Sequence, residues 1–223
     1  ELTLLMLTTN RSTFKNYLKL SYTNFSDFSD FIHKVNVKIR ARDSRIHSED
    51  IAFFSSPMHQ VKFDARIKRS NLDGTVANIN AAQVDLIIGK NTKLAGNLKI
   101  VGLPDIDKTD FITPNVFISS EHNDLENVIR ELGNLKNFKF PEVVTLFNKF
   151  AFKGSLNGQY NNFKTKGAFT TAIGDVTADG TLDLRKTIKY AGKFQSPKFN
   201  LGTITKVKDL GSSGFDLQLD GTG

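Results

Sequence analysis

Cysteine and tryptophan are both absent from this chain of 223 residues. The lack of cysteine excludes disulfide bonds and every metal site that depends on thiolate ligands. It is compatible with an oxidising compartment but does not prove one. No apolar run reaches the ~18 residues that a membrane-spanning helix needs. The chain begins at Glu1 and stops within an alternating strand pattern, so we expect it to be an internal piece of a longer protein.

Sequence patterns typical of catalysis are also missing. No Walker, dinucleotide-binding or nucleophile-elbow pattern occurs. His47, Glu49 and Asp50 form a short polar cluster, but no second histidine stands at ligand spacing, which favours a solvated loop. The acidic segment DIDKTD at 105–110 lacks the glycine and the final glutamate of a calcium loop. We therefore expect a protein that is not an enzyme and has no catalytic residues, cofactor or metal site.

Positive charge is in excess, with a net charge of +7 and a pI of about 9.5. Such a balance raises the question of nucleic-acid binding. In VKFDARIK at 61–68, however, charges of both signs alternate with apolar residues. This spacing predicts a solvated strand face, not a basic patch interleaved with stacking aromatic residues. We expect no nucleic-acid partner.

Alternation of apolar and polar residues with a period of two dominates the chain. It is clear in KVNVKIRA at 34–41, LAGNLKI at 94–100 and IKYAGKF at 188–194. Short turn sequences such as SNLDG and GKNT separate these runs at regular intervals. Consecutive strands are therefore expected to be antiparallel neighbours in a meander. Prolines 104 and 114 suit edge positions or bulges.

One stretch changes to helical spacing. Its apolar residues recur three and four positions apart, at Leu125, Val128, Ile129 and Leu132. Gly133 follows as a stop signal, and Pro141 stands at a plausible first position of a second short helix. HSEDIAFF at 47–54 predicts either a short turn of helix or an irregular strand.

These patterns predict an all-β fold, with a long, curled, mainly antiparallel sheet and a short helical insert. We expect a first β-segment at 1–120, the insert at 121–148, and a second β-segment at 149–223 that continues the same sheet. Glycines share the apolar positions of the strands, for example Gly154 and Gly158 beside Phe152 and Leu156. Since glycine on a packed inner face leaves gaps, this pattern favours a narrow apolar furrow that holds a guest.

Several segments, in order, resemble the TamB-like proteins of the AsmA-like family in the version found in Bacteroidota. The resemblance covers most of the chain from about residue 41 onward. Its motifs are RDSRIHSEDIAFFSS at 42–56, the glycine-leucine-proline turn at 102–104 within 92–111, the proline-led helix and glycine-containing strands at 140–184, and YAGKFQSPKFNLGTI at 190–204 with its box of Phe199, Leu201 and Gly202.

The resemblance implies an open, taco-shaped groove in a protein that is anchored in the inner membrane and spans the periplasm. Such proteins carry phospholipid acyl chains toward the outer membrane and assist outer-membrane protein assembly with a barrel partner. This chain would be an internal segment of that span, without the anchor. We expect the groove lining to consist of alternating apolar residues, namely Phe63, Ile67, Leu86, Leu98, Phe152, Leu156, Phe169, Val176, Leu182 and Phe194.

The alternation of apolar and polar residues has two further interpretations. The same side chains could fill the core of an extracytoplasmic β-sandwich that binds a protein partner through its edge strands. A transmembrane barrel also alternates, but it favours aromatic girdles at both ends of its strands, whereas the 19 phenylalanines here are spread along the chain.

Overall fold

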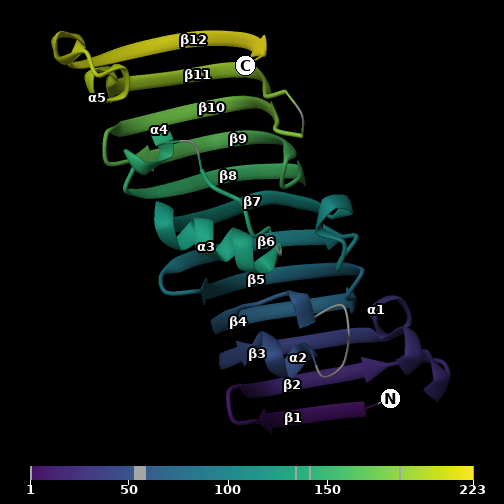
Figure 1. Ribbon diagram of the computed structural model, residues 1–223. Helices are drawn as coiled ribbons and strands as arrows, with labels where there is room; N and C mark the ends of the chain where they lie inside the picture. Colours follow the sequence, from purple (N-terminus) through teal and green to yellow (C-terminus); the bar gives the residue numbers. More distant parts are fainter. Residues whose placement is uncertain (1, 53–58, 134, 141, 186, 223) are drawn as a thin grey trace.

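The computed structural model describes residues 2–52, 59–133, 135–140, 142–185 and 187–222. Within these residues, twelve strands form one open sheet in which they lie in chain order, each antiparallel to its neighbours (Figure 1). The predicted all-β fold with an antiparallel meander is confirmed. Because there is one sheet, the β-sandwich alternative is wrong. The strands are β1 Leu2–Thr8, β2 Thr13–Ser21, β3 Asn36–His47, β4 Asp64–Thr75, β5 Asn78–Ile88, β6 Thr92–Val101, β7 Asp110–Glu121, β8 Lys149–Gln159, β9 Asn162–Thr171, β10 Gly174–Asp183, β11 Lys189–Asn200 and β12 Ser212–Thr222.

Short helices connect some of the strands, and α2, α3 and α4 lie on the same side of the sheet (Figure 1). Two of them fall within the expected insert at 121–148, and α2 accounts for the helical reading of 47–54, whose last two residues lie outside the described part of the chain. Within that part, no helix is both long enough and apolar enough to cross a membrane. The helices are η1 Phe25–Asp30, α1 Phe31–Lys34, α2 Ser48–Ala52, η3 Ile106–Lys108, α3 His122–Leu132, α4 Glu142–Thr145, α5 Leu201–Thr205 and η4 Lys208–Leu210.

Strand register aligns the apolar residues into continuous rows across the sheet. Since side chains directly opposite each other on neighbouring strands share a face, each row belongs to one face. One row runs through seven strands, from β4 to β10, with Ile67, Leu86, Leu94, Ile118, Phe152, Phe169 and Val176 opposite one another in turn. We call the face that carries this row the apolar face.

The opposite face is polar and carries ion pairs between neighbouring strands. Lys166 on β9 and Asp179 on β10 lie directly opposite each other, and Lys166 Nζ is 2.7 Å from Asp179 Oδ2. Arg45 donates to both carboxylate oxygens of Asp64 at 2.9 and 2.6 Å. Such exposed pairs add little stability each, but they keep this face in water and so define which side of the sheet is solvated.

Two prolines stand inside internal strands. The register shifts around Pro114 in β7 against both neighbours, and it shifts in the same way around Pro197 in β11. These are β-bulges, which tolerate a residue without an N–H and increase the local bend and twist of the strand. The expectation that Pro114 suits an edge or a bulge is therefore met by a bulge, and the bulges contribute to the curl of the sheet.

The sheet repeats every four strands. α2, α3 and α5 directly follow β3, β7 and β11. The next strand in each case, β4, β8 and β12, carries a Leu-Asp/Asn-Gly-Thr/Gln sequence at 72–75, 156–159 and 219–222. Gly74 and Gly158 occupy the same place in this repeat, and both have a positive φ, of +128° and +125°. The shared backbone conformation supports a structural repeat.

Candidate binding groove on the apolar face

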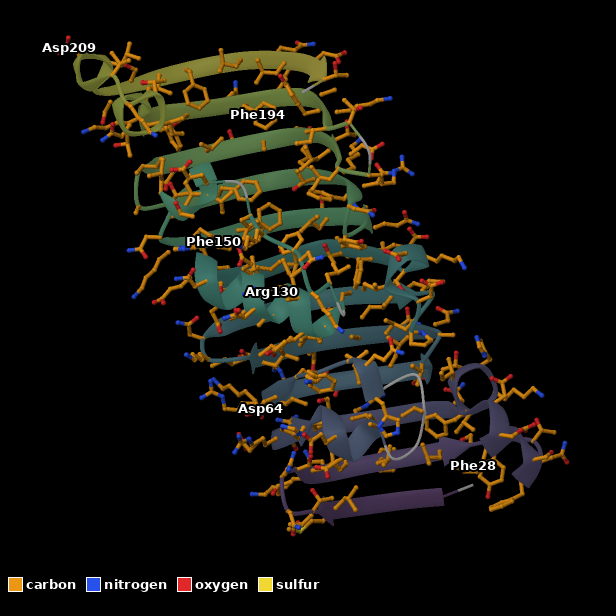
Figure 2. All side chains as sticks on the ribbon, in the orientation of Figure 1. Phe28, Asp64, Arg130, Phe150, Phe194 and Asp209 are labelled. Atoms are coloured by element: carbon orange, nitrogen blue, oxygen red, sulfur yellow. The ribbon has the colours of Figure 1, made fainter. Side chains whose placement is uncertain are left out.

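Nine of the ten residues predicted to line a groove lie in strands on the apolar face. The exception is Phe63, which directly precedes β4 and packs against the same side of the sheet. Phe150 and Phe194, two aromatic residues of this face on β8 and β11, can be followed in Figure 2. The structure thus brings the predicted residues together on one surface, while their contact with a lipid stays a prediction.

The face is packed at its N-terminal end. Phe14, Ala41, Ala65 and Ile67 form a buried cluster, and six partly buried side chains pack against it, of which Phe63 and Leu86 are predicted lining residues. These partly buried side chains are Leu18, Ile39, Ile46, Phe63, Leu86 and Ile88. At this end, the alternating side chains fill a core of the chain's own making, which leaves less room for a guest than we expected.

Toward the C-terminal end the face is open. Leu217 and Leu219 on the edge strand β12 are 42% and 39% exposed, whereas Val84 and Val116 in the middle of the sheet are 4% and 1% exposed. In the described part of β8–β12, the buried hydrophobic residues are Phe152, Ala178 and Phe199. We call the apolar face of β8–β12 the open segment. Other large side chains of this segment are half-buried, at Leu156, Phe163, Phe169, Val176, Leu182 and Phe194, while Tyr190, like Leu217 and Leu219, is exposed.

Phe152 explains one pair of glycines on this face. Gly154 and Gly167 lie opposite each other on β8 and β9. A Cβ atom at position 154 would come within 2.9 Å of the Phe152 ring, and one at position 167 within 2.7 Å. Phe152 therefore covers both glycines and is itself 2% exposed. At this pair, the space left by the missing side chains is filled by the protein's own ring and not by a guest.

A second glycine pair shares one cause with the first. At Gly154 and Gly167 an added Cβ atom would also lie 2.2 and 2.4 Å from a backbone carbonyl oxygen of the opposite strand, but the second pair has no aromatic ring among its nearest atoms. Gly180 and Gly192 lie opposite each other on β10 and β11. A Cβ atom on Gly180 would lie 2.5 Å from the carbonyl oxygen of Ala191, and one on Gly192 would lie 2.5 Å from that of Asp179. Here the two backbones approach too closely for side chains. This pair agrees with the expectation that glycines stand where the walls of the sheet come close together.

Helix α3 covers the apolar face over β5–β7. Its Asp124 accepts hydrogen bonds from the backbone N–H groups of Lys90 and Asn91, at 3.1 and 2.9 Å, in the turn between β5 and β6. It also accepts one from Thr92 Oγ1 at 2.7 Å, and the Thr92 hydroxyl lies 2.7 Å from that of Ser120. Thr92 and Ser120 belong to the apolar face, so the carboxylate is bound to the side of the sheet that α3 covers.

The electrostatics of Asp124 follow from these bonds. Burial raises the pKa of the carboxyl group, but the donors from Thr92, Asn91 and Lys90 outweigh it, so the pKa lies below its ordinary value of 3.8. Asp124 is 6% exposed, and Val128, one turn later in α3, is 5% exposed. The ionised side chain therefore holds the helix on the sheet at neutral pH.

The two acidic segments considered as metal sites have other partners. Asp50 accepts from the hydroxyls of Thr9, at 2.8 Å, and Ser12, and Glu49 pairs with Arg11. The cluster predicted to be a solvated loop is therefore the attachment of α2 to the β1–β2 turn.

In the second acidic segment, Lys108 Nζ lies 3.0 Å from Asp105, and the Tyr160 hydroxyl donates to Asp107 at 2.9 Å. These partners are side chains of the protein itself. Among the described residues, no group of three or more histidine or acidic side chains is arranged to hold a metal ion.

Sequence reasoning identified α3 but missed its role as a cover. The signal lay in the third residue of two helices that directly follow strands, Asp50 in α2 and Asp124 in α3. Each carboxylate binds the turn of a nearby hairpin. Comparison of the two segments, HSED and EHND, would have indicated a repeated attachment.

The chain was also compared with known proteins. Protein-family models, curated proteins and solved structures gave no match.

Proposed function

We propose that this chain is a non-enzymatic segment of a lipid-conducting groove, which shields phospholipid acyl chains in the periplasm between the inner and outer membranes. The observation that carries the proposal is the continuous apolar face of a single open sheet, half-exposed over β8–β12. An open face of this kind is unusual in a water-soluble monomer, because large exposed apolar patches mark binding surfaces.

The energetic argument concerns the hydrocarbon tail. Each methylene transferred out of water contributes ~0.8 kcal/mol, so exposing a sixteen-carbon chain costs on the order of 12 kcal/mol. A continuous apolar face keeps the tail covered at every step while the head group stays in water. A tight binding site would slow this movement, so conduction of the tail does not require one.

The dimensions of the sheet suit a path and not a single site. Neighbouring strands lie ~4.8 Å apart, so twelve strands extend for about 50 Å across the sheet. The apolar rows run in this direction, at right angles to the strands. The four-strand repeat returns a leucine and a glycine to equivalent positions in β4, β8 and β12, so part of this surface recurs along the sheet.

The family resemblance supplies the rest of the proposal. It supports a full-length protein that is anchored in the inner membrane and reaches the outer membrane, where it also assists protein assembly with a barrel partner. Strands β1 and β12 form the two edges of the described sheet, and their unpaired backbone groups are suited to pair with strands of another protein.

A photo-crosslinking experiment tests the proposal. A photoreactive amino acid at Phe169, on the apolar face, is expected to trap phospholipid from vesicles. The same amino acid at Lys166, which lies on the polar face opposite Asp179, is the matched control and is expected to trap none. Equal labelling at both positions, or none at Phe169, would overturn the proposal.

A further inference from the structure

Helix α3 lies across the strands of the apolar face and is attached to them at three places. Its first residue, His122, directly follows β7. Asp124 binds the β5–β6 turn, as described above. Near its last turn, the carbonyl oxygen of Glu131 accepts a hydrogen bond from the N–H of Lys62 at 3.1 Å, two residues before β4. The helix therefore extends from β7 to the approach of β4 on the apolar side of the sheet (Figure 1).

Residues in the middle of the sheet are more deeply buried than those of the open segment. Val84 on β5 and Val116 on β7 are almost fully buried, while the open segment beyond β8 is half-exposed. Gly89 in the β5–β6 turn lies under Val128, because a Cβ atom there would come within 2.9 Å of Val128 Cγ2. A hydrocarbon tail on the open segment therefore meets α3 if it moves toward β4.

We propose that α3 is a hinged lid that divides the groove, with Asp124 as its latch. This inference rests on the proposed lipid function. Closed, as in this structure, the lid confines hydrocarbon to the open segment; raised, it exposes the apolar face of β5–β7. An isolated helix of this length is marginal in water, so its position depends on its attachments to the sheet. The polar latch suits a moving part, since each of its groups can bind water when the lid is raised.

The absence of cysteine provides a clean test. Lys62 and Glu131 are both exposed, and their backbones are joined by a hydrogen bond, so the double variant Lys62→Cys with Glu131→Cys is placed to lock the lid by a disulfide. The control is Lys38→Cys with Asp73→Cys, which ties two directly opposite residues on the polar face of β3 and β4. Both double variants are studied oxidised and after reduction.

The probe is a phosphatidylcholine whose acyl chain carries a diazirine, presented in vesicles, and labelled residues are mapped by mass spectrometry. We expect the lipid to label β9 and β10 in every state. Label on the apolar face of β5–β7 is expected to disappear when the disulfide locks the lid and to return when the disulfide is reduced. Asp124→Asn is expected to raise that label by about tenfold, because a hydrogen-bonded charge is lost from the latch. Asp175→Asn, at an exposed position of β10, is its control and is expected to change nothing.

The outcomes separate the two proposals. Absence of label from β9 and β10 in all states would overturn the lipid function and the lid together. Label on β9 and β10 with equal label on β5–β7 in the locked and reduced states would overturn the lid alone. A gain of label with Asp175→Asn equal to that with Asp124→Asn would also overturn the latch.

Discussion

Phe152 and Phe169 lie directly opposite each other across the β8–β9 pair, with ring centroids 4.6 Å apart and ring planes tilted by 38°. The first ring covers the glycine pair of the same two strands, and the second remains half-buried in the open segment. One aromatic pair thus does two things: it replaces the side chains that the glycines lack, and it forms part of the surface proposed to receive lipid.

The glycine under this pair gives the first prediction. We expect Gly167→Ala to destabilise the protein by about 1–3 kcal/mol, as is typical of overpacking. Its Cβ would lie 2.4 Å from the carbonyl oxygen of Lys153, which cannot move independently of β8, and 2.7 Å from the Phe152 ring. Urea denaturation measures the change. Thr170→Ala, at an exposed position of the same strand, is the control and is expected to stay within about 0.5 kcal/mol of the parent.

The open segment gives the second prediction. Leu182→Asp is expected to abolish uptake of a fluorescent phospholipid, because it places a charge on the apolar face while the half-buried position allows the sheet to fold. Thr181→Asp adds the same charge one residue earlier, at an exposed position of the polar face, and is expected to leave uptake unchanged. Circular dichroism confirms that both variants are folded. Equal loss of uptake in the two would contradict a binding surface confined to one face.

Local patterns were enough to predict which side chains share a face. Period-two alternation placed Leu86, Phe169 and Val176 on one side because neighbouring strands in a meander pair directly, and the structure has them there. Alternation could not distinguish one sheet from two, since a strand in either carries the same pattern. That choice depends on whether distant strands stack, which local sequence does not encode.

The details of the candidate site depended on contacts between segments far apart in the chain. That Phe152 covers Gly167 follows from cross-strand register, and that Asp124 binds Thr92 follows from the path of α3. Neither is visible in the spacing of residues within one segment. The sequence therefore predicted a continuous apolar furrow, where the structure has a packed end, a covered middle and an open segment.

The latch gives the third prediction, which concerns pH. The pKa of Asp124 is lower in the folded protein than its ordinary value of 3.8, so ionisation favours folding. Its stabilising contribution is fully present above that ordinary value and is lost as the pH falls below it, through the lowered pKa. Asp124→Asn is therefore expected to lower the free energy of unfolding by about 1–3 kcal/mol at pH 7 and by progressively less below pH ~4. Urea denaturation of both proteins across this range measures the difference. A cost that stays constant into strong acid would contradict the role of the charge.

The four-strand repeat gives the last prediction, which compares three glycines at the same place in β4, β8 and β12. At Gly74 and Gly158, φ is positive, and an added Cβ would lie 2.2 and 2.4 Å from the carbonyl oxygen of an asparagine in the next strand. Because alanine would be strained both by the positive φ and by the short contact with the carbonyl oxygen, we expect it to lower the free energy of unfolding by about 1–3 kcal/mol at either position.

Gly221, the third of these glycines, differs because its strand is at the edge. No positive φ strains it, and the atoms that an added Cβ would meet belong to the ring and hydroxyl of Tyr190, at 2.7 Å and beyond. Tyr190 is 37% exposed, so its ring is free to turn aside into solvent. We therefore expect Gly221→Ala to cost less than Gly74→Ala and Gly158→Ala, which should resemble each other, when the three are compared by urea denaturation. If Gly221→Ala lowered the free energy of unfolding as much as the other two substitutions, the prediction would be wrong. Gly221 would then be restrained by its backbone, as Gly74 and Gly158 are, and not by the movable ring of Tyr190.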